Sequence, residues 1–148
     1  MILNKRQLII MQGLSGSGKT TWVAKHHPDA TVVSADLFFS KGTDRYEFDP
    51  KLLGKAHSWC LRRFINELDR GTTTIVMDNT NTEPWEWFNY AKLATHWGYK
   101  WGVVDMYDDS LTDEQLADRC IHGVSAEAIA KQRERYTHAK PEELYSEV

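Results

Sequence analysis

The chain has 148 residues, 41% of them hydrophobic and 26% charged, and its formal net charge is −3. This length predicts one domain with its own hydrophobic core, and no apolar stretch approaches the roughly 18 residues that a membrane-spanning helix needs. The weakly acidic balance argues against a broad nucleic-acid-coating surface, although a local patch could still hold one strand end. We expect a cytoplasmic protein without a signal peptide or a membrane partner, and buried free thiols at Cys60 and Cys120, which lack metal-ligand partners at useful spacing.

The first predicted strand, residues 7–12, leads into an octet that matches the Walker A phosphate loop, Gly13-Leu14-Ser15-Gly16-Ser17-Gly18-Lys19-Thr20. A predicted helix follows, and this strand–loop–helix context favours a phosphate loop over a Gly/Ser linker. Lys19 would reach the β- and γ-phosphates, and the Thr20 hydroxyl would hold Mg²⁺. We therefore expect ATP and Mg²⁺ as cofactors, and ATP rather than GTP because no N-K-x-D motif follows. The expected nucleotide contacts are Gly13, Ser15, Gly16, Ser17, Gly18, Lys19, Thr20, Thr21 and Arg119.

Strand and helix patterns alternate along the rest of the chain. The predicted elements are a strand at 31–34, a loop at 40–45, a helix from Asp49-Pro50 to about Asp69, a strand at 73–78, a helix at 83–97 capped by Thr82, a strand at 99–106, a helix at 113–121 opened by a Thr112–Gln115 capping box, and a helix at 126–138 capped by Ser125. This order predicts a three-layer α/β fold of the P-loop NTPase type, with a mainly parallel sheet, helices on both faces and a helical lid. We expect a single domain over residues 1–140 and a loosely held acidic tail over 141–148.

Two aspartates, Asp36 and Asp78, stand at the carboxyl ends of predicted strands. The first predicted strand likewise leads at its carboxyl end into the phosphate loop. Ligands in parallel sheets bind beyond the carboxyl ends of the strands, so Gly13, Asp36 and Asp78 should share one sheet edge. Asp78 follows three apolar residues, the Walker B pattern, whose Asp holds Mg²⁺; a turn-capping Asp is the alternative. Asp36 could accept the proton of an attacking hydroxyl, or it could cap the next helix. The expected metal ligands are Thr20, Asp36 and Asp78.

Phosphoryl transfer also needs positive charge on the transferring group. Arg119, near the end of the helix at 113–121, could supply it from a lid, and Arg133 and Arg135 are further candidates. The alternative for each of the three is a solvated surface arginine. The expected catalytic residues are therefore Asp36, Lys19 and Arg119.

Several further segments follow the phosphate loop in a family-specific order. They are Thr31-Val32-Val33-Ser34-Ala35-Asp36, Tyr46-x-Phe48-Asp49-Pro50, Ala56-His57, Asp78-Asn79-Thr80-Asn81-Thr82, Gly98-Tyr99 and Arg119-x-x-His122-Gly123-Val124. The series resembles the polynucleotide-kinase-like P-loop kinases, which include the 5′-hydroxyl kinase domain of bacteriophage polynucleotide kinase. The resemblance covers nearly the whole chain, and it implies transfer of the γ-phosphate of ATP to a hydroxyl, in the best-known members the 5′-OH of DNA or RNA.

The resemblance also implies roles for single residues. Asp36 would be the general base, Asp78 would lie behind the acceptor site, and Arg119 would be a lid arginine on the donor phosphates. The expected residues of the acceptor site are Asp36, Phe39, Asp78, Asn79 and Asn81.

This chain departs from the phage kinase at two cationic positions. Phe39 stands where the phage kinase has an arginine for the acceptor phosphate, so Lys41 or Arg45 would have to replace that charge. An aromatic ring at Phe39 could stack on a base or lie in the core. A second lid arginine has no clear match, and His122 stands near its place.

Three functions follow from these observations. The leading one is an ATP-dependent kinase for the 5′-OH of a polynucleotide. The second is a P-loop kinase for a nucleoside, a hydroxymethylated DNA base or another small-molecule hydroxyl, which the acidic charge and Phe39 favour. The third is a nucleotide-binding ATPase module without an acceptor, which would not need Asp36.

Overall fold

The computed structural model describes residues 5–40 and 45–146. The strands are β1 (Gln7–Gln12), β2 (Thr31–Val33), β3 (Thr74–Asp78) and β4 (Lys100–Asp105). The α-helices are α1 (Lys19–His26), α2 (Leu37–Ser40), α3 (Leu53–Arg70), α4 (Pro84–His96), α5 (Asp113–Arg119) and α6 (Ala126–Arg135), and the 3-10 turns are η1 (Pro50–Leu52) and η2 (Pro141–Glu143). Within the described ranges, no helix combines the length and apolar character that crossing a bilayer requires.

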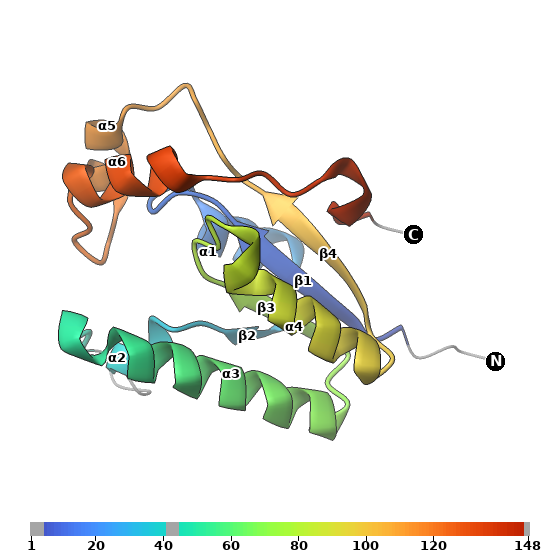
Figure 1. Cartoon of the computed structure of the whole chain (residues 1–148). Coiled ribbons are helices and arrows are strands. Elements are labelled where there is room, and N and C mark those ends of the chain that lie inside the picture. Colours follow the sequence, from blue (N-terminus) through green and yellow to red (C-terminus); the bar gives the residue numbers. More distant parts are fainter. Residues whose placement is uncertain (1–4, 41–44, 147–148) are drawn as a thin grey trace.

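The four strands form one sheet in the order β2-β3-β1-β4, and every neighbouring pair is parallel. In the register of β1, Met11 pairs with Asp78 of β3 and with Val104 of β4. The carboxyl ends of these strands therefore coincide at one edge, beyond which α5 and α6 lie together (Figure 1). This arrangement confirms the predicted α/β fold and brings the phosphate loop and Asp78 to the same edge.

Alternate side chains of the central strand build the two faces of the sheet. Leu8 and Ile10 pack into the cluster that contains the buried residues of α3 and α4, whereas Ile9 and Met11 pack against Val23 of α1. All four strand side chains are fully buried, and α3 and α4 lie in front of the sheet with α1 behind it (Figure 1). Burial of these apolar side chains supplies the main stabilisation of a three-layer fold of this kind.

The helix starts differ from the predictions in one informative place. Glu83, not Thr82, is the N-cap of α4, and it forms a capping box with Glu86. Thr82 is fully buried, and its hydroxyl donates to the Glu86 carboxylate at 2.7 Å, so it supports the cap from behind. The predicted caps Thr112 and Ser125 are confirmed.

Residues 141–146 are attached to the sheet, which corrects the expectation of a loosely held tail. The Tyr145 N–H donates to the Val103 carbonyl at 2.9 Å, and the Tyr145 ring packs against the cluster of Ile9 and Met11. A Cβ on Gly102 would lie 2.5 Å from the Tyr145 Cα, so the two backbones are in close contact. The acidic composition of the segment led to the prediction of a loose tail, whereas Tyr145 attaches the segment to the sheet.

Candidate active site

The phosphate loop has the backbone geometry that its sequence predicts. Gly16 and Gly18 have φ angles of 81° and 96°, a left-handed region that side-chain-bearing residues rarely adopt. Gly18 is also the N-cap of α1, so the helix directs its positive end toward the loop. The Ser17 hydroxyl is buried in the loop without a hydrogen-bond partner among the described residues, which fits a loop that receives phosphate oxygens.

Lys19 is folded back onto the loop. Its ammonium donates to the carbonyl oxygens of Gly13 at 2.9 Å and Leu14 at 3.0 Å. Burial lowers the pKa of Lys19, and the nearby charge of Asp78 opposes this shift. The same flexible side chain can reach a phosphate that enters the loop.

Thr20 and Asp78 form the pair that the Walker motifs predict. The Thr20 hydroxyl, at the exposed start of α1 beside the exposed Thr21, donates to Asp78 Oδ2 at 3.0 Å. Burial raises the pKa of Asp78, and the charge of Lys19 partly offsets this shift. Hydroxyl and carboxylate oxygens are the ligands that Mg²⁺ prefers, so these two residues fit the ion.

Asp36 lies past the end of β2, with a side chain that is 54% exposed. Its Oδ1 accepts a hydrogen bond from the Tyr46 hydroxyl at 3.1 Å, and its Oδ2 lies 3.3 Å from His122 Nδ1. Its charge acts on both Lys19 and Asp78, so the carboxylate belongs to the same electrostatic site. It is nevertheless separate from the Thr20–Asp78 pair.

The lid, which we define as α5, α6 and their connection, packs directly on the phosphate loop. Gln132 of α6 accepts from the Ser15 N–H and donates to the Ser15 hydroxyl, both at 3.0 Å. Leu14 of the loop forms a buried cluster with Leu116 of α5 and Ile129 of α6. The lid is therefore part of the loop's own packing.

Of the three candidate arginines, Arg119 lies at the phosphate loop. Its Nη2 is 3.6 Å from the position of a Cβ on Gly18. Arg133 instead bonds Asp113 at 3.0 Å within the lid, and Arg135 donates to the Thr82 hydroxyl at 2.9 Å. Of the three, Arg119 is thus the arginine that lies beside the phosphate loop, whereas Arg133 and Arg135 have structural partners elsewhere.

Three expected acceptor contacts have internal partners. Phe39 is 7% exposed and packs in the main core, which supports the core alternative over a stacking role. Asn81 is 2% exposed and donates to the Met11 carbonyl at 2.7 Å, so its side chain fixes the backbone at the carboxyl end of β1 and does not face an open site. Asn79 accepts from the Ala35 N–H at 3.0 Å and so supports the backbone next to Asp36.

Two residues, Lys41 and Arg45, were expected to supply a positive charge near Phe39, and the structure describes one of them. Arg45 lies next to Tyr46 in the chain, with its Nε 3.8 Å from Glu47. Lys41 lies outside the described residues.

Sequence reasoning assigned no role to three residues that complete the site, Tyr46, His122 and Gln132. Tyr46 and His122 stand in the family-like segments, but no local pattern says that they meet at Asp36. Gln132 reads as an ordinary polar position of an exposed helix, and only its contact with Ser15 reveals its role.

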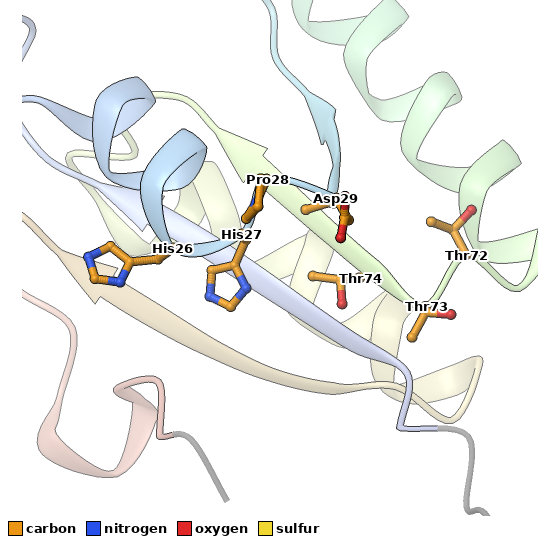
Figure 2. Close-up of a pocket in the computed structure, with 8 residues that line it drawn as sticks. His26, His27, Pro28, Asp29, Thr72, Thr73 and Thr74 are labelled. Carbon is orange, nitrogen blue, oxygen red and sulfur yellow. The ribbon is translucent and has the colours of Figure 1, made fainter.

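Two hollows in the surface lie at different distances from this chemistry. A hollow of about 460 Å³ is lined by His26, His27, Pro28, Asp29, Ala30 and Thr72–Thr74 (Figure 2). These residues surround the amino ends of β2 and β3, opposite to the phosphate loop. A smaller hollow of about 210 Å³ includes Thr20 and Asp78 in its lining and therefore belongs to the candidate site.

Parallel sheet, glycine loop, Thr–Asp pair and lid arginine together define a P-loop nucleotide-binding domain of the kinase-like type. The family described as "AAA domain" matches residues 8–139, and the chain belongs to this family. It is 35% identical to human NEDD4-binding protein 2 over 136 residues, and 32% identical to mouse heterogeneous nuclear ribonucleoprotein U-like protein 2 over 87 residues. The matches cover 87% and 51% of this chain, but they span only 8% and 12% of those proteins.

Solved structures share the fold at low sequence identity. A chain of the Pnkp1/Rnl/Hen1 RNA repair complex superimposes with a TM-score of 0.64 at 18% identity, covering 90% of this chain and 45% of that one. A gluconokinase from Sinorhizobium meliloti 1021 gives a TM-score of 0.58 at 15% identity, covering 93% and 80% of the two chains.

Proposed function

We propose that this protein is an ATP-dependent kinase that transfers the γ-phosphate to a hydroxyl group, with the 5′-OH of a polynucleotide as its acceptor. One observation carries the proposal: a second, exposed carboxylate, Asp36, lies within electrostatic reach of Lys19 and yet outside the Thr20–Asp78 pair. A module that only binds ATP needs no such acid at the sheet edge. A kinase needs one to orient and deprotonate its acceptor.

The chemical step follows from these positions. Asp36 takes the proton of the acceptor hydroxyl while that oxygen forms a bond to the γ-phosphorus. The bond between the γ-phosphorus and the β–γ bridging oxygen breaks, and ADP leaves with its electron pair. Lys19 would exchange its contacts with the Gly13 and Leu14 carbonyls for phosphate oxygens, and Arg119 would face the same charge from the lid.

Mg²⁺ would be held by Thr20 and Asp78 and would neutralise charge on the β- and γ-phosphates. The likeness to a chain of an RNA repair complex is the reason to test RNA ends as well as DNA ends.

A second acceptor class is favoured by the position of Phe39. Phe39 carries no charge and is buried in the core, so it cannot bind an acceptor phosphate at that place. An acceptor without such a phosphate, a nucleoside or a hydroxymethylated base within DNA, would not need one.

A panel of acceptors with γ-labelled ATP and Mg²⁺ separates these proposals. The panel contains DNA and RNA oligonucleotides with 5′-OH ends, the same oligonucleotides with 5′-phosphates, nucleosides, DNA with hydroxymethylated bases, and a reaction without acceptor. We expect label on the 5′-OH ends only. Label on nucleosides or modified bases alone would replace the polynucleotide by the second acceptor class, and equally fast ATP consumption without any acceptor would indicate an ATPase module.

Asp36→Asn is the first variant to test in the same assay. It should lose at least about a hundredfold in transfer rate, because general-base catalysis typically contributes that much or more, while nucleotide affinity stays near that of the wild type. Asp29→Asn, a neutralised aspartate at the opposite hollow, is the matched control. Full transfer by Asp36→Asn would show that the base is assigned wrongly.

A further inference from the structure

Asp36 is held by two side chains from distant parts of the chain. The Tyr46 hydroxyl, in the segment before η1, donates to Oδ1 at 3.1 Å. His122 Nδ1, in the connection between α5 and α6, lies 3.3 Å from Oδ2. The two rings also stack on each other, with centroids 4.1 Å apart and planes inclined by 11°. The three side chains thus form one unit, which we call the Tyr46–Asp36–His122 clamp.

An exposed carboxylate needs such partners if it is to act at one defined point. With 54% of its side chain exposed, Asp36 would otherwise exchange between rotamers, and phosphoryl transfer depends on a fixed line between acceptor oxygen and phosphorus. Each carboxylate oxygen has two lone pairs. Tyr46 and His122 can therefore hold the group while one oxygen still accepts a hydrogen bond from the acceptor hydroxyl.

The clamp also joins the acceptor side to the lid. His122 comes three residues after Arg119, whose guanidinium lies over Gly18 of the phosphate loop. One short lid segment therefore contacts the donor side through Arg119 and the acceptor side through His122. The lid is also joined to the loop by the two hydrogen bonds between Gln132 and Ser15.

We propose that Tyr46 and His122 are positioning residues that hold the Asp36 carboxylate in line with the phosphate loop, and that the lid thereby serves the acceptor as well as the donor. This inference rests on the proposed kinase function. It assigns His122 to the acceptor side, although its place in the chain is near that of a second lid arginine in the phage kinase.

The chain contains a matched control for the clamp. At the end of β4, Asp105 accepts from the Tyr136 hydroxyl at 2.6 Å and lies 2.5 Å from His138 Nδ1. Its side chain is only 16% exposed, and its two partners belong to the segment that follows α6. This second Tyr–Asp–His group ties two parts of the fold together without touching Asp36.

The test compares Tyr46→Phe, His122→Leu and His122→Asn with Tyr136→Phe and His138→Asn in the full chain, using ATP, Mg²⁺ and a 5′-OH oligonucleotide. Tyr46→Phe keeps the ring and removes only the hydroxyl. Both Tyr46→Phe and His122→Leu should lower kcat about tenfold through misplacement of the base, with the KM for ATP unchanged within about twofold. His122→Asn should recover part of the loss, because its amide can donate to Asp36.

A variant that combines Tyr46→Phe and His122→Leu should have a kcat only slightly below that of the more affected single variant, since both residues act through one carboxylate. The control variants should keep kcat within about twofold of the wild type, even where they lower the melting temperature. Unchanged kcat in Tyr46→Phe and His122→Leu, with an active wild type, would overturn the inference and leave the kinase function standing. A wild type that transfers phosphate to no acceptor would overturn both.

Discussion

Lys19 and Asp78 are two titratable groups whose pKa values are shifted by burial at the phosphate loop. Burial lowers the pKa of Lys19 and raises the pKa of Asp78, so each group is pushed toward its neutral form, and each opposes the shift of the other. Nucleotide phosphates in the loop would place negative charge beside Lys19 and so favour its charged form. Perturbed pKa values of this kind are typical of functional sites.

Asp78→Asn should therefore make the ligand-free protein more stable near neutral pH while weakening Mg²⁺-dependent nucleotide binding. Because the native pKa of Asp78 lies above its ordinary value of 3.8, the stability linked to its protonated form is complete below pH 3.8. That stability is lost as the pH rises through the native pKa. Melting temperatures across this pH range should show a gap in favour of Asp78→Asn that closes toward acid; a wild type that melts higher at neutral pH would contradict the argument.

At the scale of elements, the phosphate loop and the lid behave as one packed unit. The loop contributes Leu14 to the cluster of the two lid helices, and Ser15 is bonded twice to Gln132. Gly16 comes so close to α5 that a Cβ there would lie 2.3 Å from the Leu116 carbonyl oxygen. The second glycine of the octet is thus required by the lid as well as by phosphate binding.

Gly16→Ala should destabilise the protein by about 1–3 kcal/mol, because it combines a backbone clash with a left-handed φ of 81°. The loss should appear as a lower melting temperature without nucleotide, and ATP affinity should fall with it. Gly54→Ala is the control: Gly54 is in α3 with no atom within 4 Å of the added Cβ, so the change should be neutral or slightly stabilising. Equal melting temperatures of Gly16→Ala and wild type would refute the contact.

At the scale of the molecule, the residues that follow α6 bond to the end of β1 and to β4. Gln12 is fully buried at the end of β1, and its amide bonds the Asn81 carbonyl, the Thr137 carbonyl and the Ala139 N–H. The chain then returns along β4, where Tyr145 meets Val103. The segment after the lid therefore holds the sheet edge that carries the site.

Removal of residues 141–148 should lower the free energy of unfolding by about 1–3 kcal/mol, from the lost backbone hydrogen bond and the exposed Tyr145 contact surface. Urea denaturation measures this change. Glu142→Gln, which removes one exposed negative charge and keeps the segment, should leave the midpoint unchanged. An unchanged midpoint in the truncated chain would show that the contacts of Tyr145 carry no stability.

The predictable part of the site is the part that local pattern or parallel-sheet geometry controls. The octet from Gly13 to Thr20 is one contiguous motif, and Asp78 follows its strand directly, so both were predicted together with their shared edge. Phe39 and Asn81 were harder, because a polar or aromatic residue past a strand can face a ligand or the interior, and here burial decides for the interior. The tail was predicted wrongly as loose because acidic composition outweighed a single buried anchor, Tyr145.

The sequence by itself determined the nucleotide half of this protein, since a phosphate loop is built from consecutive residues whose backbone conformations glycine makes possible. It also determined the order of strands and helices, and hence the edge at which Asp36 and Asp78 lie. Only the tertiary structure decided what surrounds Asp36. Tyr46 and His122 are far apart in the chain, and they meet because the lid packs on the phosphate loop, which is a consequence of long-range burial and not of any local pattern.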